Sequence, residues 1–200
     1  MDPQFNLGEN PPPLTEDQQN ISLFQSVVEK ARAEGFGSGF PNFNTAQYNG
    51  AKARGAVLIK EPPATFRDIW VGELGNVAPD NFKELLKAVN KYATEHGFVG
   101  GMPTFSYANP GHGIVCGAFL FSPEDAEWRD VSLADVGGNL DDVAARFVAT
   151  QAYATKNGFV GGFPNMFHAD YGRGFVCGTV LLKASVAVWK DLLTPISILK

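Results

Sequence analysis

Three stretches of this sequence resemble one another, and that repetition constrains the fold more than any other feature. Each begins with Gly-Phe, passes through small residues into an apolar residue and a proline, and ends in Asn or Thr followed by Phe or Met. The three are Gly35–Phe43, Gly97–Phe105 and Gly158–Met166, which begin 62 and 61 residues apart. Self-similarity at a fixed spacing predicts a chain built from three copies of one unit.

The similarity continues past these segments in the same register for about thirty residues. An aromatic residue, a basic residue and an aspartate recur at 66–68, 128–130 and 189–191. The unit is longer than the repeats of helical solenoids, which reach about 47 residues, and a lone unit of ~60 residues buries little surface. We therefore expect the three units to share one core with pseudo-threefold symmetry; an open linear stack is the alternative.

Each unit is predicted to open with an amphipathic helix and to continue with two strands. Thr15 and Gln18 have the spacing of a capping box at the first helix. Gly35, Gly97 and Gly158 stand where a left-handed glycine commonly ends a helix. The proline-containing segment then forms a short extended strand, and a glycine-bearing turn leads to a strand rich in Val, Leu, Ile and Phe. The aromatic–basic–Asp segment makes a third short strand or a return loop.

These elements predict an α+β fold of three tandem α-β-β repeats of about 61 residues that share one core, with the helices packed on an antiparallel sheet or barrel. A disordered N-terminal tail covers residues 1–14. The repeats cover 15–77, 78–138 and 139–200 and together form one globular domain.

Two further sets of positions recur within the units. Gly55, Gly117 and Gly178 lie at or near the start of the stronger strand, which predicts a bulge or a close approach of two backbones near the threefold axis. The aspartates of the aromatic–basic–Asp segments are Asp68, Asp130 and Asp191. We expect each of them to cap a turn or to contact a basic residue of the next unit, because three packed units need a polar contact at each of their three junctions.

Composition excludes several classes of protein. The chain has 200 residues, of which 44% are hydrophobic and 18% charged, and this excludes wholesale disorder. The net charge of −5 and the lack of a basic cluster predict no nucleic-acid partner. Apolar runs stay far below the roughly 18 residues of a membrane helix, so we expect no membrane partner. The N-terminus lacks the features of a signal peptide, which predicts a cytoplasmic protein.

The repeated positions offer no catalytic, metal or cofactor site. His96, His112 and His168 do not align with one another, so equivalent metal ligands are not expected. The glycine-rich segment at residue 35 follows a helix, whereas a dinucleotide-binding loop follows a strand, and we expect no cofactor. Cys116 and Cys177 occupy equivalent apolar strands, where buried and inert thiols are expected.

The Phe-Pro-Asn-Phe loop is the best candidate for binding a ligand. It sets aromatic rings beside a carboxamide, a chemistry that suits sugars, whose C–H faces stack on rings and whose hydroxyls need hydrogen-bond partners. Tyrosines follow the loop in two units, and the third unit adds a histidine and an aspartate. The candidate ligand-binding residues are Phe40, Asn42, Phe43, Tyr48, Thr104, Phe105, Phe163, Asn165, His168, Asp170 and Tyr171.

Two interpretations of this loop stay open. In the first, the aromatic residues belong to the core and the Asn side chain caps a turn. In the second, the loop forms a shallow ligand pocket, and the chain is a non-enzymatic, multivalent, lectin-like protein that binds a glycan or another small molecule. Its repetition is similar to that of lectins built by internal triplication, in symmetry alone.

Two other functions are weighed against carbohydrate binding. A structural scaffold or protein-interaction domain is the first alternative, because 16 phenylalanines would allow an exposed apolar patch. An enzyme with one site in the third unit, using His168, Asp170, Tyr171 and Arg173, is the second. Oligomerisation is compatible with all three functions.

Overall fold

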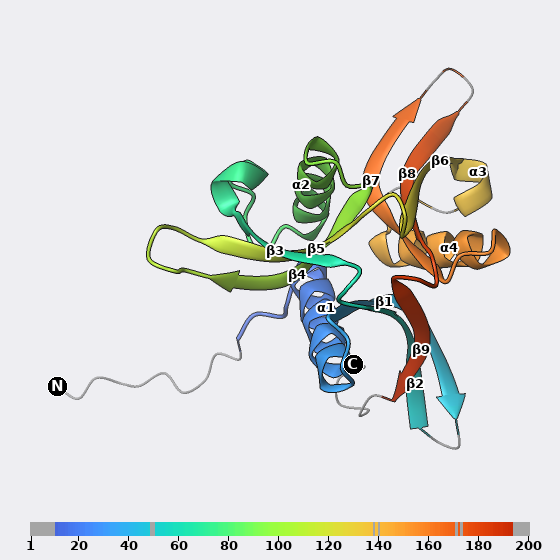
Figure 1. Cartoon of the computed structure of the whole chain (residues 1–200). Coiled ribbons are helices and arrows are strands. Elements are labelled where there is room, and N and C mark those ends of the chain that lie inside the picture. The colour runs from blue at the N-terminus through green and yellow to red at the C-terminus, as the bar shows by residue number, and fades with distance from the viewer. Residues whose placement is uncertain are drawn as a thin grey trace.

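The structure is a computed structural model that describes residues 11–48, 51–137, 139, 141–170, 172 and 174–193. Within these residues the chain forms four α-helices, one 3-10 helix and nine strands (Figure 1). The helices are α1 (Glu16–Ala33), η1 (Val71–Leu74), α2 (Phe82–Glu95), α3 (Leu133–Val136) and α4 (Val143–Lys156). The strands are β1 (Ser38–Tyr48), β2 (Ala51–Ile59), β3 (Thr65–Trp70), β4 (Gly100–Ala108), β5 (Val115–Phe121), β6 (Ala126–Ser132), β7 (Gly161–Asp170), β8 (Phe175–Leu182) and β9 (Ala187–Leu193).

The strands form three separate antiparallel sheets, in the orders β1-β2-β9, β3-β5-β4 and β6-β8-β7. This confirms the α+β composition, but the strands do not join into the single sheet or barrel that we expected. Figure 1 shows the three sheets extending from the centre in different directions. The prediction of a triplicated unit with pseudo-threefold symmetry stays a prediction.

Each sheet consists of a hairpin and one strand from elsewhere in the chain. The strand that follows each hairpin in sequence crosses to another sheet: β3 pairs with β5, β6 pairs with β8, and β9 pairs with β2. The aromatic–basic–Asp segments are therefore strands, and each one ties two sheets together. Because β9 returns to the first sheet, the set of crossings closes on itself.

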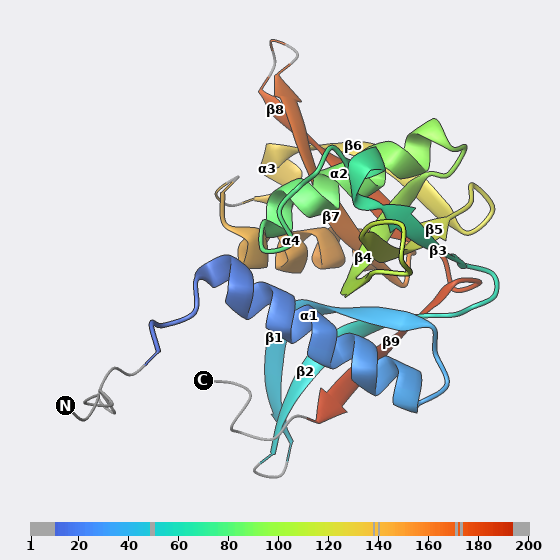
Figure 2. The same ribbon diagram turned by 90° about the vertical axis from the view of Figure 1, so that its left-hand side faces the viewer.

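The three longer helices pack around a common aromatic core. Helix α1 contacts β1 and β4, α2 contacts β4 and β7, and α4 contacts β7 and β1; Figure 2 shows α1 in front of the first sheet. The rings of Phe24, Phe82 and Phe147 meet between the helices, with centroids 4.9, 5.4 and 6.2 Å apart. All three rings are fully buried, and each contributes about 1.5–3 kcal/mol of transfer free energy.

Local signals set the ends of the helices. Thr15 forms the expected capping box with Gln18 at the start of α1. The three glycines after the helices, Gly35, Gly97 and Gly158, have φ between 84° and 90°. Such a φ is strained for any residue with a Cβ, so glycine is favoured there.

A bulge interrupts the first strand of every hairpin just after its proline. The pairing register shifts between Pro41 and Thr45, between Pro103 and Tyr107, and between Pro164 and His168. One non-glycine residue in each bulge has a left-handed backbone; these are Phe43 (φ 67°), Phe105 (φ 56°) and Met166 (φ 68°). The bulge lies in the proline-containing strand, not in the glycine-containing strand where we expected it.

Candidate functional site

The structure buries most of the residues that the sequence proposed for ligand binding. Phe40 and Phe163 have no exposed surface, and Phe105 has 1%. The polar side chains of Asn42, Thr104 and Asn165 are equally buried. These residues of the recurring Phe-Pro-Asn-Phe segment thus belong to the core, and their side chains do not reach solvent.

The two asparagines of this loop hold the bulge together. Oδ1 of Asn42 accepts a hydrogen bond from the backbone N–H of Asn44 at 3.0 Å, and Oδ1 of Asn165 accepts one from Phe167 at 3.0 Å. This geometry confirms the first interpretation of the loop, in which Asn caps a turn. The Nδ2 atom of each asparagine is buried without a hydrogen-bond partner.

The remaining proposed residues lie at different depths. Phe43 is half-buried against the rings of Phe24 and Phe147. His168 and Asp170 are exposed on β7, and Oδ1 of Asp170 accepts a hydrogen bond from the backbone N–H of Gly172 at 2.8 Å. Tyr171 and the Tyr48 side chain lie outside the described part of the structure.

Thr104 and Phe105 also border a hollow between α1 and β4. Its volume is about 450 Å³, and Gln25, Glu29 and Arg32 of α1 form the opposite wall. Gln25 donates a hydrogen bond from Nε2 to the carbonyl oxygen of Phe105 at 2.8 Å. This hydrogen bond joins α1 to β4, so we assign the contact to the packing of the helix on the strand.

Three accessible aromatic rings occupy equivalent positions in the strands that cross between sheets. Phe66, Trp128 and Trp189 are 38%, 37% and 38% exposed. Each ring lies over a glycine of the central strand: Trp128 over Gly178, Trp189 over Gly55 and Phe66 over Gly117. The ring atoms are 2.5–3.1 Å from the position that a Cβ would occupy, so only glycine leaves the ring enough room there.

The buried amide or hydroxyl of the bulge approaches the same Cβ position of each glycine. Asn165 Oδ1 is 2.5 Å from the Cβ position of Gly178, Asn42 Oδ1 is 2.8 Å from that of Gly55, and Thr104 Oγ1 is 2.7 Å from that of Gly117. The close approach that we expected at these glycines therefore involves side chains, not two backbones. The aspartate of the crossing strand pairs with the same glycine in the strand register: Asp130 with Gly178, Asp191 with Gly55 and Asp68 with Gly117.

In the third sheet these features border a pocket of about 270 Å³. Trp128 and the 42% exposed Phe167 supply aromatic surface, and Asp130 and His168 supply polar groups. Gly178 belongs to the floor, together with Ala169 and Val176. We missed Trp128, Asp130 and Phe167 as site residues, although the recurrence of an aromatic residue, an Asp and a strand glycine was the signal that could have found them.

The environment of His168 favours its neutral form. Burial lowers the pKa of its imidazole, and the positive charges of Lys87, Arg146 and Lys83 lower it further. The carboxylate of Asp141 acts in the opposite direction. The imidazole in the pocket can therefore accept a hydrogen bond or a proton near neutral pH.

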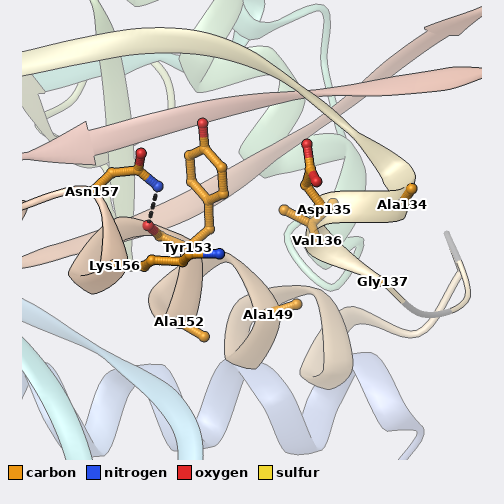
Figure 3. A pocket seen from close by; sticks show the side chains of 9 residues that line it. All are labelled: Ala134, Asp135, Val136, Gly137, Ala149, Ala152, Tyr153, Lys156 and Asn157. Carbon is orange, nitrogen blue, oxygen red and sulfur yellow. Dashed lines mark hydrogen bonds between the residues drawn. The ribbon is translucent and has the colours of Figure 1, made fainter.

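A larger hollow of about 490 Å³ lies between α3 and α4 (Figure 3). Tyr153 stands in it, and its hydroxyl accepts a hydrogen bond from Arg129 at 3.3 Å. The guanidinium of Arg129 also lies 5.6 Å from the Phe159 ring centroid. This hollow lacks the exposed ring over glycine, so we do not take it as the candidate site.

The basic residue of each crossing strand contacts a neighbouring helix or the end of one. Arg67 donates to the hydroxyl of Tyr92 as Arg129 does to that of Tyr153, and Lys190 pairs with Glu34. Tyr92 and Tyr153 belong to α2 and α4, and Glu34 directly follows α1. Each of these helices packs on the sheet that the crossing strand joins. A role of the aspartates in capping turns or joining units stays a prediction.

Two classes of feature are absent from the described residues. They contain no group of three or more His, Cys, Asp or Glu side chains placed to hold a metal ion. None of the helices in this part of the chain has both the length and the apolar character needed to cross a membrane. Cys116 and Cys177 are both free and buried.

No protein-family model, no curated protein and no solved structure matches this chain.

Proposed function

We propose that this chain is a non-enzymatic, multivalent protein that binds carbohydrate. The observation that carries the proposal is the pocket beside Trp128, where two accessible aromatic rings border a site that also holds a carboxylate and an imidazole. A sugar ring presents C–H groups on its faces and hydroxyls around its edge. Aromatic surface receives the faces, while Asp130 and His168 supply hydrogen-bond partners for the hydroxyls.

The proposed site differs from the one expected from the sequence, although both use aromatic and polar groups. Asn165 does not contact the ligand; its Oδ1 holds the backbone of Phe167 and so positions that exposed ring at the pocket. Trp128 takes over as the stacking surface. The roles of His168 and the ligand class are retained from the sequence-based proposal.

Multivalency rests on the recurrence of one arrangement in three sheets. Trp189 and Asp191 accompany Gly55 in the first sheet, as Trp128 and Asp130 accompany Gly178 in the third. The second sheet places a phenylalanine on its glycine instead of a tryptophan. We infer a triplicated, pseudo-threefold unit with two stronger sites and one weaker site. On a polymeric ligand, several sites bound at once give a higher overall affinity than any single site.

Affinity electrophoresis tests this proposal with soluble polysaccharides of different linkage, namely xylan, galactomannan, laminarin and hydroxyethyl cellulose. At least one should retard the wild-type chain. Trp128→Ala should weaken that retardation at least tenfold, since the indole supplies the stacking surface. Trp70→Ala is the matched control because Trp70 is 38% exposed and does not border the pocket.

Two outcomes would overturn the proposal. The first is that none of the four polysaccharides retards the wild-type chain. The second is that Trp70→Ala and Trp128→Ala reduce retardation equally while both remain folded by circular dichroism. A further loss on combining Trp128→Ala with Trp189→Ala supports more than one site.

One observation favours an enzyme as the second candidate. Asp130 and His168 border the same pocket, and an imidazole kept neutral can act as a general base. This pair replaces the His168–Asp170 pair that the sequence suggested, since the Asp170 carboxylate is engaged in its own turn. Release of reducing sugar from a retained polysaccharide, abolished in His168→Gln, would favour the enzyme over the binding protein.

A further inference from the structure

We propose that the junction of α2, α4 and β7 binds an oxyanion of the phosphate or sulfate type, with the buried guanidinium of Arg146 as its main ligand. Lys83 and Lys87 of α2 and His168 of β7 complete the site. The proposal does not rest on carbohydrate binding: Arg146, Lys83 and Lys87 do not border the pocket beside Trp128, and only His168 belongs to both sites.

The first observation is the state of Arg146. The residue is 2% exposed, yet its Nη1 atom has no hydrogen-bond partner. Within the described part of the chain no carboxylate forms an ion pair with this guanidinium, and its buried Nη1 lacks an acceptor. A buried charge without a partner is strongly unfavourable, whereas an anion seated against it removes most of that cost.

The second observation is the set of charges that face His168. Lys83 and Lys87 approach from α2, and Arg146 approaches from α4, and all three act on its imidazole. The carboxylate of Asp141, in the turn before α4, opposes them. Lys87 is paired with Glu84, and Asp130 borders the pocket that holds His168. Arg146 and Lys83 are therefore the cations of this junction without a carboxylate partner among the described residues, and an anion would neutralise their charge.

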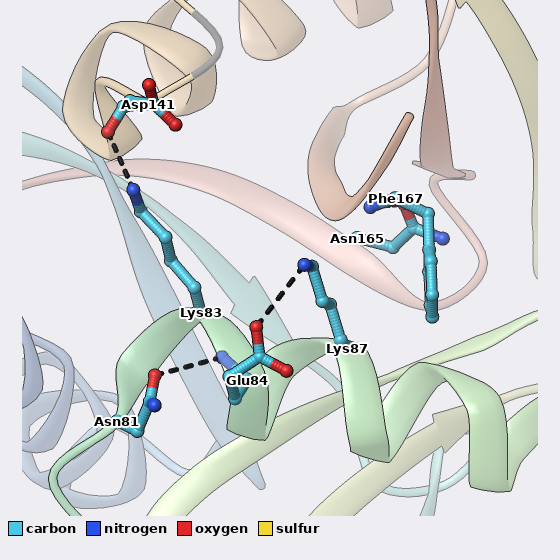
Figure 4. Close-up of polar contacts among 7 residues, drawn as sticks. All are labelled: Asn81, Lys83, Glu84, Lys87, Asp141, Asn165 and Phe167. Carbon is cyan, nitrogen blue, oxygen red and sulfur yellow. Dashed lines mark hydrogen bonds and ion pairs between the residues drawn. The ribbon is translucent and has the colours of Figure 1, made fainter. Parts of the chain in front are cut away.

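The lysines have alternative partners that an anion could replace. Lys83 donates to the backbone carbonyl oxygen of Asp141 at 2.8 Å, and Lys87 pairs with Glu84 at 3.3 Å on an exposed helix face. Figure 4 shows both side chains rising from α2, Lys83 toward the start of α4 and Lys87 on the side of β7. Exposed pairs of this kind contribute little, so a small reorientation of either ammonium group toward an anion is inexpensive.

The geometry of the donors favours an oxyanion over a halide. Arginine presents its N–H groups as a planar fork that matches two oxygens of a phosphate or sulfate. A tetrahedral oxyanion has enough oxygens to accept from the fork and from the surrounding ammonium and imidazole groups together.

Isothermal titration calorimetry with inorganic phosphate tests the site, at pH 6.5 and an ionic strength held constant with sodium chloride. Wild type should bind phosphate, and Arg146→Met should weaken binding at least tenfold, because methionine fills the buried space without the charge. Lys91→Met is the matched control: it removes a cation from the same helix α2, but Lys91 does not act on His168. It should bind phosphate as wild type does.

A second measurement needs no variant of Arg146. A bound oxyanion adds negative charge beside His168, so phosphate should raise the pKa of this imidazole in a proton NMR titration. His168→Gln identifies the resonance among the three histidines. Absence of phosphate binding in wild type, equal binding by wild type and Arg146→Met, or an unchanged pKa of His168 in saturating phosphate would each overturn the proposal.

The oxyanion could be free or could be carried by a larger ligand, and glucose 6-phosphate separates the two. Equal affinity for phosphate and glucose 6-phosphate assigns the site to the free oxyanion. At least tenfold tighter binding of glucose 6-phosphate, with the excess lost in Trp128→Ala, assigns it to a phosphorylated sugar. Phosphate binding that survives in Trp128→Ala keeps this site standing even where carbohydrate binding fails.

Discussion

The indole of Trp128 lies against the backbone of Gly178, with its Cζ2 atom 2.8 Å from the position that a Cβ of residue 178 would occupy. Gly178→Ala should therefore displace either the indole or the Asn165 amide, which is 2.5 Å from the same point. We expect a loss of about 1–3 kcal/mol in the free energy of unfolding. Urea unfolding measures it, with tryptophan fluorescence reporting displacement of the ring.

Gly72→Ala is the control for this substitution. No heavy atom lies within 4 Å of its Cβ position, so the added methyl group meets open space. Equal stability of the Gly72→Ala and Gly178→Ala variants would contradict the packing of Trp128 on Gly178.

A second prediction concerns Asn90, whose side chain joins α2 to β4. Its Nδ2 donates to the carbonyl oxygens of Leu86 and Gly101, and its Oδ1 accepts from the N–H of Gly101. Asn90→Ala leaves buried backbone groups of Gly101 without a partner, each at about 1–3 kcal/mol. Thermal unfolding should show a much larger loss than for Asn109→Ala, which removes one exposed hydrogen bond to Gly111. Similar melting temperatures for the two variants would argue against this role.

A third prediction concerns the reactivity of Cys116. Burial raises the pKa of its thiol to about 11; the neighbouring Tyr107 hydroxyl acts to lower this pKa, and the charge of Asp68 acts to raise it. At pH 8 the folded protein should therefore hold roughly 100-fold less thiolate at this position than an unfolded chain. Iodoacetamide labelling followed by peptide mass spectrometry should modify Cys116 only after urea is added. Fast labelling of the folded protein would contradict the burial.

The same thiol makes stability depend on alkaline pH. Below pH 9 both the folded and the unfolded chain keep Cys116 protonated, so its contribution is fully present. Between pH 9 and 11 the unfolded chain ionises first, and the free energy of unfolding should fall by up to about 3 kcal/mol. Cys116→Ala should remove part of this decline in a series of urea unfolding experiments, while the fall that remains reports other groups such as the half-buried Tyr107.

A fourth prediction separates the two contacts that Arg129 makes with α4. Its guanidinium lies 6.0 Å from the ring centroid of Tyr153 and also donates to the Tyr153 hydroxyl. Arg129→Met should cost about 1 kcal/mol, whereas Tyr153→Phe, which keeps the ring, should cost less. Lys156→Met removes an exposed cation of the same helix and serves as the control. A larger loss for Tyr153→Phe than for Arg129→Met would show that the hydrogen bond, not the ring, holds the strand to the helix.

The sequence predicted much of the local structure because local rules decide it. The capping box at Thr15 and the glycine at residue 35 define the ends of α1 through contacts within a few residues. The extended segments at 66–68, 128–130 and 189–191 are strands, as their recurrence allowed. The turn held by Asn42 was one of the two interpretations open from the sequence, and it also depends on neighbouring residues.

Only the tertiary structure decided which aromatic residues are buried and which remain accessible to solvent. Phe163 and Trp128 are both aromatic residues in strands, yet the first has no exposed surface and the second is 37% exposed. The difference arises because β6 crosses from the β4-β5 hairpin to pair with β8, so that Trp128 lies over a glycine about fifty residues later in the chain. Burial of a side chain depends on residues distant in sequence. The repetition thus indicated which sequence positions recur, and the crossing of strands between sheets determined which of those side chains are accessible.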